Sequence, residues 1–64
     1  MTEDEERWAE ALAIERIHGS LAPRFVAERI GALTLAGDAA GVARWQEIGR
    51  RLSALSGPED RIAI

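Results

Sequence analysis

The side chain best suited to acid–base chemistry in this chain is His18, the single histidine among 64 residues. An unperturbed histidine changes its charge near neutral pH, so it can serve as a general acid or base. The nearest candidate partners along the sequence are Glu15 and Ser20. A histidine at the end of a helix also interacts favourably with the last backbone carbonyls. We interpret His18 as such a helix-end residue and not as a catalytic one.

Other residue types that commonly carry catalysis or hold metals are scarce. The 64 residues include no cysteine and no tyrosine, so they can form neither a disulfide nor a thiolate metal site. One histidine cannot hold a zinc ion alone, and a domain of this size has little room for a cleft. We therefore predict a protein that is not an enzyme. No catalytic residue, metal, cofactor or small-molecule substrate is expected.

Arginine supplies every basic side chain, and Arg44, Arg50 and Arg51 fall on the polar side of a predicted helix. Such a strip is ordinarily a solvated helix face, but it can also face the phosphates of a nucleic acid. The acidic start of the chain opposes the second interpretation, because residues 1–16 hold six acids and two arginines. Nucleic-acid binding through these arginines is therefore the alternative function.

The first helix that must position these side chains is predicted over residues 3–18. Thr2 and Glu5 have the spacing of a capping box, and the first turn is acidic, which suits the positive end of the helix dipole. Gly19 follows the last turn, as is typical of a helix C-terminus. No apolar run reaches the roughly 20 residues of a membrane span, and a signal peptide would begin with basic residues. We expect a cytoplasmic protein without membrane contact.

Two further helices are predicted over residues 23–36 and 39–56. Pro23 suits the first turn of the earlier helix, and Asp38 can cap the later one. The link between them, Gly37-Asp38, is so short that the two helices must be antiparallel neighbours. Gly41 and Gly49 lie beside the apolar side of the last helix and predict the close approach of another helix.

These patterns predict an all-α fold. We expect a compact three-helix bundle forming one domain over residues 1–56, with an antiparallel hairpin of the second and third helices. Residues 57–64 are expected to be a flexible C-terminal tail. The core is predicted from apolar residues at helical spacing; its members are Leu12, Ile17, Val26, Ile30, Leu33, Trp45, Ile48 and Leu52.

The first helix carries more apolar surface than one neighbour can cover. Trp8, Ala11 and Leu12 share one side of it, whereas further apolar residues spread around the other. A helix that is apolar on two sides requires two neighbours. We predict the surplus surface at Trp8 and Ile14, together with Leu35 on the far side of the second helix.

Three segments of the chain resemble known sequences. They are ERIHG at residues 15–19, APRFVAERIGAL at 22–33 and LAGDAAGVARW at 35–45. Together they are similar to short, uncharacterised proteins encoded in alphaproteobacterial genomes, which carry a domain of unknown function. This resemblance spans roughly residues 8–55. It implies a small helical bacterial protein and supplies no activity, cofactor or site residue.

The predicted function is therefore binding. We expect a small protein-interaction module that forms a homodimer or serves as an accessory or regulatory subunit of another protein, with a phage-related regulator as a special case. Its candidate interface residues are those of the surplus apolar surface and of the arginine strip; they are Trp8, Ile14, Leu35, Arg44, Arg50 and Arg51.

Overall fold

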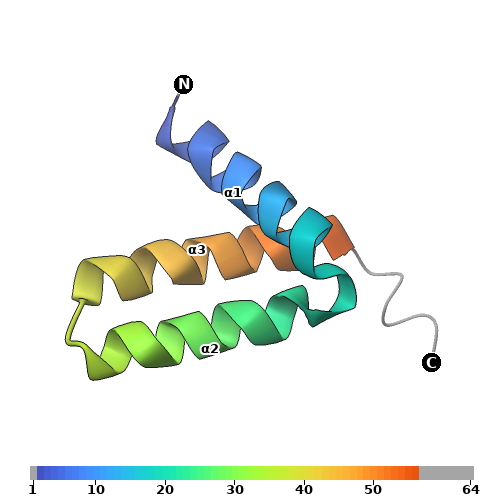
Figure 1. Ribbon diagram of the computed structural model, residues 1–64. Helices are drawn as coiled ribbons and strands as arrows, with labels where there is room; N and C mark the ends of the chain where they lie inside the picture. The colour runs from blue at the N-terminus through green and yellow to red at the C-terminus, as the bar shows by residue number, and fades with distance from the viewer. Residues whose placement is uncertain (1, 57–64) are drawn as a thin grey trace.

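The computed structural model describes residues 2–56. It contains α1 (Glu3–His18), the 3₁₀ turn η1 (Gly19–Leu21), α2 (Ala22–Leu35) and α3 (Ala39–Ser56), as Figure 1 shows. The described part of the chain is all-helical, which confirms the predicted fold class. The bounds of α1 and α3 are as predicted, and α2 begins and ends one residue earlier. The tail predicted at residues 57–64 lies outside the described residues.

The helices α2 and α3 form an antiparallel hairpin (Figure 1). Gly37 ends α2 with a φ of 74°, a left-handed conformation that glycine adopts without steric cost. Asp38 then caps α3, because its Oδ1 accepts a hydrogen bond of 2.9 Å from the Gly41 N–H. The turn chemistry predicted at Gly37-Asp38 is confirmed, and it explains why the hairpin reverses within so few residues.

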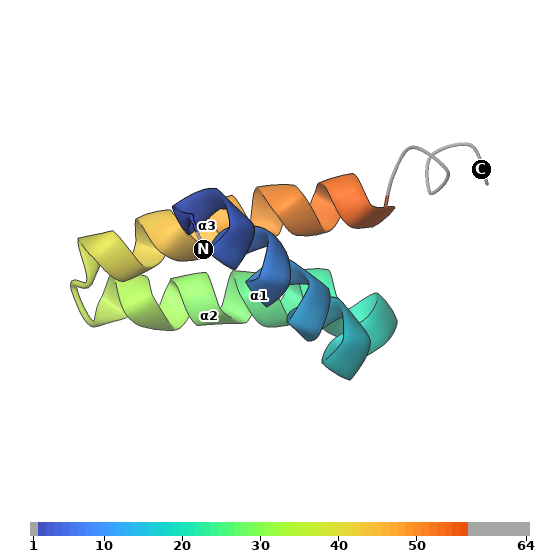
Figure 2. The same ribbon diagram turned by 90° about the horizontal axis from the view of Figure 1, so that it is seen from above.

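The helix α1 begins with the predicted capping box. The Thr2 hydroxyl accepts from the Glu5 N–H at 3.1 Å, and the Glu5 carboxylate accepts from the Thr2 N–H at 2.8 Å. At the other end Gly19 has a φ of 55°, and the short turn η1 bends the chain sharply into α2. As a result α1 lies obliquely across the hairpin instead of alongside it, which both views show (Figures 1 and 2).

The core where α1 meets the hairpin is small. Its buried members are Ala11, Ile14, Ala22, Val26, Ile48 and Leu52, and Phe25, Ile30 and Trp45 pack against it. The predicted burial of Val26, Ile48 and Leu52 is confirmed, whereas Ile30, Leu33 and Trp45 are half-buried.

Three predictions about α1 are wrong. Leu12 and Ile17 were expected in the core but are 38% and 75% exposed, whereas Ile14, expected at the surface, is only 8% exposed. The reason is the rotation of α1. Ala11 and Ile14 are three residues apart on one side of the helix and face the hairpin, so Leu12 and Ile17 turn away from it.

The two glycines of α3 have different roles. A Cβ atom at Gly49 would lie 3.3 Å from Cγ1 of Val26, so α2 approaches α3 closely there, as predicted. At Gly41 a Cβ atom would lie 2.6 Å from Oδ2 of Asp38, the cap of the same helix. The prediction that Gly41 marks a helix–helix contact is therefore wrong, because the space beside it is taken by the capping carboxylate.

Gly31 in α2 offers a test of this arrangement. A methyl group added there would meet nothing within 4 Å beyond the adjacent residues and the backbone of α2 itself. Since alanine favours a helix interior over glycine by about 1 kcal/mol, we expect Gly31→Ala to raise the free energy of unfolding by about that amount. Gly49→Ala is the matched control. Its free energy of unfolding should rise by less, because the added methyl group presses on Val26. Urea unfolding followed by circular dichroism measures both; equal gains would contradict the close α2–α3 approach.

Candidate protein-interaction surface

The outward side of α1 carries apolar residues between Trp8 and Ile17. The helix shows almost none of the asymmetry between an apolar and a polar side that a surface helix normally has. Its inner side is covered by the hairpin, and its outer side carries further apolar residues that stay exposed. We call this set the outer α1 face; its residues are Trp8, Ala9, Leu12, Ala13 and Ile17.

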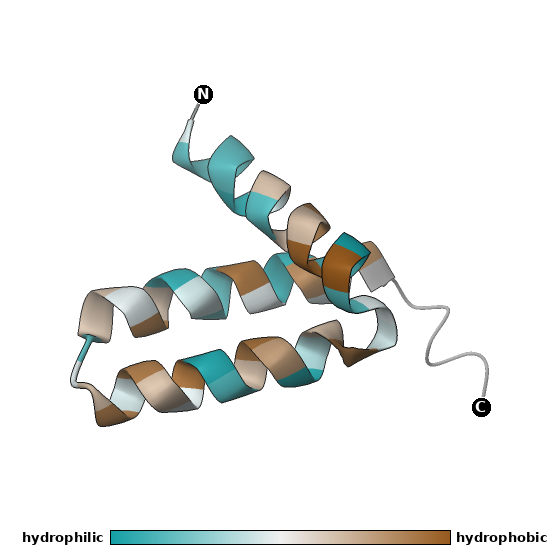
Figure 3. Ribbon diagram, viewed as in Figure 1, coloured by the Kyte–Doolittle hydropathy of each residue, from teal (hydrophilic) through white to brown (hydrophobic). Residues whose placement is uncertain are grey.

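Opposite charges lie at the two ends of this face. The first turn of α1 contains Glu3, Asp4, Glu5 and Glu6, and its last turn contains Arg16 and His18. Figure 3 shows the hydrophilic colour over the N-terminal turns of α1 and the hydrophobic colour nearer its C-terminus. Arg16 is exposed and makes no ion pair with any residue in the range 2–56. The outer α1 face thus has an acidic end, an apolar middle and a basic side chain near its other end.

Trp8 lies at the seam between α1 and α3 and is 39% exposed. The guanidinium carbon of Arg51 is 5.7 Å from the centre of the Trp8 ring, a distance at which a cation is attracted to the π-face. Arg51 also bonds Asp4, one helical turn before Trp8, with 2.5 Å between Nη2 and Oδ1. These contacts hold one side of the indole ring against α3, so Trp8 presents a fixed surface to solvent.

Arg51 acts mainly within the fold. Besides Asp4, its Nη1 donates to the Glu47 carbonyl at 3.3 Å, and its Nε is buried with no hydrogen-bond partner among the described residues. A guanidinium group placed in this way faces the protein more than it faces solvent. Arg51 was predicted as an interface candidate, and the structure shows it joining α3 to α1.

Arg44 also points toward α1. Its Nη2 forms an ion pair with Oε2 of Glu10, while Oε1 of Glu10 accepts from Arg7 at 2.6 Å. Of the three arginines in the predicted strip, Arg50 is exposed and has no ion pair within residues 2–56. Carboxylates of α1 therefore neutralise two of the three cations that a nucleic acid would meet.

The charge pairs shift two pKa values. Burial disfavours the charged form of Glu10, but hydrogen bonds from Arg44 and Arg7 outweigh it and hold the pKa of this carboxyl below its ordinary value. The hydrogen bond to Glu10 raises the pKa of Arg44. Glu10 is therefore ionised throughout the neutral range and links α1 to α3 electrostatically.

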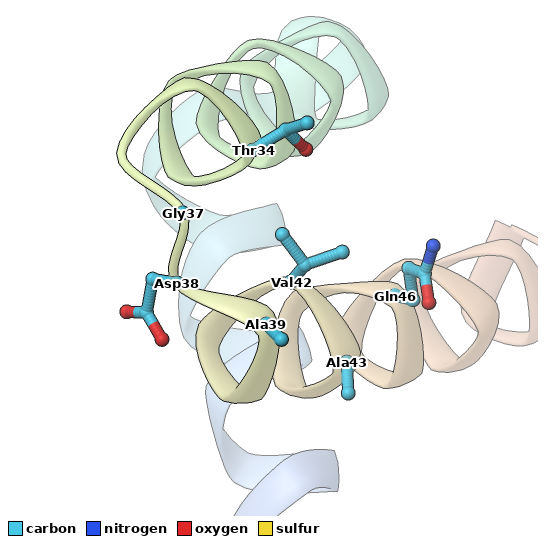
Figure 4. Close-up of a pocket in the computed structure, with 7 residues that line it drawn as sticks. All are labelled: Thr34, Gly37, Asp38, Ala39, Val42, Ala43 and Gln46. Carbon is cyan, nitrogen blue, oxygen red and sulfur yellow. The ribbon is translucent and has the colours of Figure 1, made fainter.

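Leu35, another predicted interface residue, is 91% exposed but belongs to the opposite end of the molecule. It is the last residue of α2, beside the hairpin turn, and α1 does not reach that end (Figure 1). A shallow pocket of about 330 Å³ lies nearby, between the turn and α3. Figure 4 shows Thr34 on α2 and Val42 and Gln46 on α3 beside it, while the Asp38 carboxylate points away. Leu35 is thus separate from the outer α1 face.

His18 packs at the corner between α1 and α2. Its ring stacks on Phe25 with centroids 4.0 Å apart, and Phe25 in turn meets Trp45 edge-on at 5.9 Å. This aromatic row is not predicted from the sequence. Its only local signal is that His18 and Phe25 lie on either side of the turn between α1 and α2. Residues 2–56 hold no group of three His, Asp or Glu side chains suited to a metal ion. None of the helices there is long and apolar enough to span a bilayer.

Comparison with known proteins places the chain in a family. Residues 3–60 match a family described as a family of unknown function, DUF6961. The chain belongs to this family. The match includes all three segments on which the resemblance to proteins with a domain of unknown function rests. None of the curated proteins and none of the solved structures compared with this DUF6961 chain matches it.

Glu10 makes the stability of this DUF6961 chain depend on pH. Because the folded state lowers the Glu10 pKa below 4.5, the ionised carboxyl stabilises the fold above that value, and this contribution is lost as the pH falls through the lower folded pKa. We expect Glu10→Gln to be less stable than the unmodified chain near neutral pH. The difference should shrink as the pH falls below 4.5.

Urea unfolding between about pH 7 and about pH 3 measures this difference. Glu28→Gln is the matched control, because the Arg24–Glu28 pair has a longer separation of 3.5 Å and lies within the exposed surface of α2. The role assigned to Glu10 would be contradicted if the difference in the free energy of unfolding between Glu10→Gln and the unmodified chain were as large at acidic pH as at neutral pH.

Proposed function

We propose that this chain is a small, non-enzymatic protein-interaction module whose contact surface is the outer α1 face. In this proposal it works either as a homodimer or as an accessory or regulatory subunit bound to another protein. The observation that carries the proposal is the rotation of α1. The helix already has its core contact through Ala11 and Ile14, and yet Trp8, Leu12 and Ile17 remain exposed.

The grouping of these residues matters more than their number. Single apolar residues on a protein surface are ordinary, whereas several on one continuous face mark an interaction site. Burying apolar surface stabilises by about 25 cal/mol per Å², so covering this face gives a partner a substantial driving force. Trp8 adds a large, held aromatic ring of the type enriched among binding hot spots.

The size of the core supports the same proposal. Its six buried residues include two alanines, which contribute little apolar area. Small domains without disulfides or metals often gain stability through association. We propose that the three helices form one compact bundle whose outer side, along α1, is closed by the partner.

Leu12→Ser tests this function, with Leu35→Ser as the matched control. Both leucines are exposed, but only Leu12 belongs to the outer α1 face. We expect the unmodified tagged chain, expressed in its native host, to copurify with a protein partner, which includes untagged copies of the chain itself. Leu12→Ser should reduce the recovered partner about tenfold, as expected when a central contact is removed, and Leu35→Ser should leave it unchanged. Quantitative mass spectrometry measures the recovery.

Circular dichroism of both variants checks that the helices remain formed. Equal recovery with Leu12→Ser and the unmodified chain would show that the outer α1 face does not bind the partner. Recovery lost only with Leu35→Ser would move the interface to the hairpin end.

A further inference from the structure

We infer that the occupant of the outer α1 face is a second copy of this chain, packed so that the two α1 helices run antiparallel. This inference rests on the proposed function and names its partner. A two-fold dimer needs a surface that complements itself, since the same patch meets its own copy. The outer α1 face has this property in both charge and side-chain size.

Charge complementarity follows from the direction of the helix. Glu5 lies in the acidic first turn of α1 and Arg16 in its basic last turn, and both are exposed. Two antiparallel α1 helices bring the first turn of each beside the last turn of the other. Glu5 of each copy then lies opposite Arg16 of the other copy, so the dimer contains two such charge pairs. Two parallel helices would instead place like charges together, which is destabilising.

Size complementarity follows in the same register. With Glu5 opposite the second copy's Arg16, Trp8 falls opposite the second copy's Ala13, and Leu12 opposite the second copy's Ala9. Trp8 and Leu12 thus each face an alanine, the arrangement that lets two surfaces interdigitate, whereas Ile17 falls opposite the second copy's Asp4. Glu5, Ala9, Leu12 and Arg16 follow one another at intervals of four, three and four residues, which is the spacing of a helix–helix seam.

The capping box leaves the charge pair free to form. Only Oε1 of Glu5 bonds the Thr2 N–H, so its second carboxylate oxygen can accept from a guanidinium group. Trp8 is held on its inner side by Arg51 and needs no rearrangement to meet a partner. The dimer therefore uses the helix as it stands, at little conformational cost.

Mixing two charge variants tests the register directly. In a dimer of the Glu5→Arg variant, two arginines would face each other at each of the two charge pairs. In a dimer of the Arg16→Glu variant, two glutamates would face each other there. We expect each variant to dimerise at least about tenfold more weakly than the unmodified chain. In an equal mixture both pairs of the heterodimer are again of opposite charge, so dimerisation should return. Sedimentation equilibrium of the full chain, at concentrations up to about 1 mM, measures these constants.

A second pair of variants keeps the test independent of the capping box. Ala9→Gln adds a long side chain to the centre of the outer α1 face, and Ala32→Gln makes the same change at an exposed position of α2. Alanine and glutamine both have good helix propensity, so both variants should fold. We expect Ala9→Gln to weaken dimerisation about tenfold or more, and Ala32→Gln to leave it unchanged.

The outcomes separate this inference from the proposed function. A chain that stays monomeric at about 1 mM overturns the inference, and so does a dimer that Ala9→Gln and the charge variants leave intact. If a different protein is then captured in a Leu12-dependent manner, the interaction function stands without self-association. If the chain is monomeric and no partner is captured in a Leu12-dependent manner, both the inference and the proposed function are wrong. Dimerisation lost in each charge variant and restored in their mixture supports the antiparallel α1 pair.

Discussion

The contact between α1 and the hairpin depends on small side chains. Ala11 and Ala22 are almost completely buried where the helices meet, and they let the backbones approach with Ile14, Val26, Ile48 and Leu52 packed around them. Such a contact is close but shallow, because alanine contributes little apolar area. Of the large apolar residues of α1, it buries only Ile14. The exposure of Trp8, Leu12 and Ile17 is therefore a consequence of how the core is built.

Charged side chains set the position of α1 on this shallow contact. Arg51 reaches Asp4 and the Trp8 ring, and Arg44 reaches Glu10, which Arg7 also bonds. Exposed ion pairs contribute modestly to stability, but two such clusters along one helix restrain how it rotates and slides. The arginines of α3 thus act together with the core contact to hold α1 in the orientation that leaves Trp8, Leu12 and Ile17 exposed.

The two ends of the molecule differ in what they depend on. The hairpin turn is built from local interactions, a left-handed glycine and a capping aspartate, and does not need α1. The α1 end combines a small core with an apolar outer face. Association through that face would add buried area beside the small core, so folding and binding would be coupled by mass action. The outer α1 face is therefore the surface through which we propose that this DUF6961 chain binds its partner.

The helices, their caps and the turn could be predicted from the order of the amino acids. These features rest on contacts within a few residues, such as Thr2 with Glu5 and Asp38 with Gly41, so local patterns suffice to predict them. The side of α1 that faces inward could not be predicted in this way, because it depends on how the helices pack against one another. Apolar residues surround this helix, so their periodicity favours no single side, and Ile14 was assigned to the surface while Leu12 and Ile17 were assigned to the core. Arg44 and Arg51 likewise could be placed on α3 from the sequence, but their carboxylate partners on α1 lie more than thirty residues away along the chain. Such long-range pairs form only once the helices have packed, and no local pattern reports them.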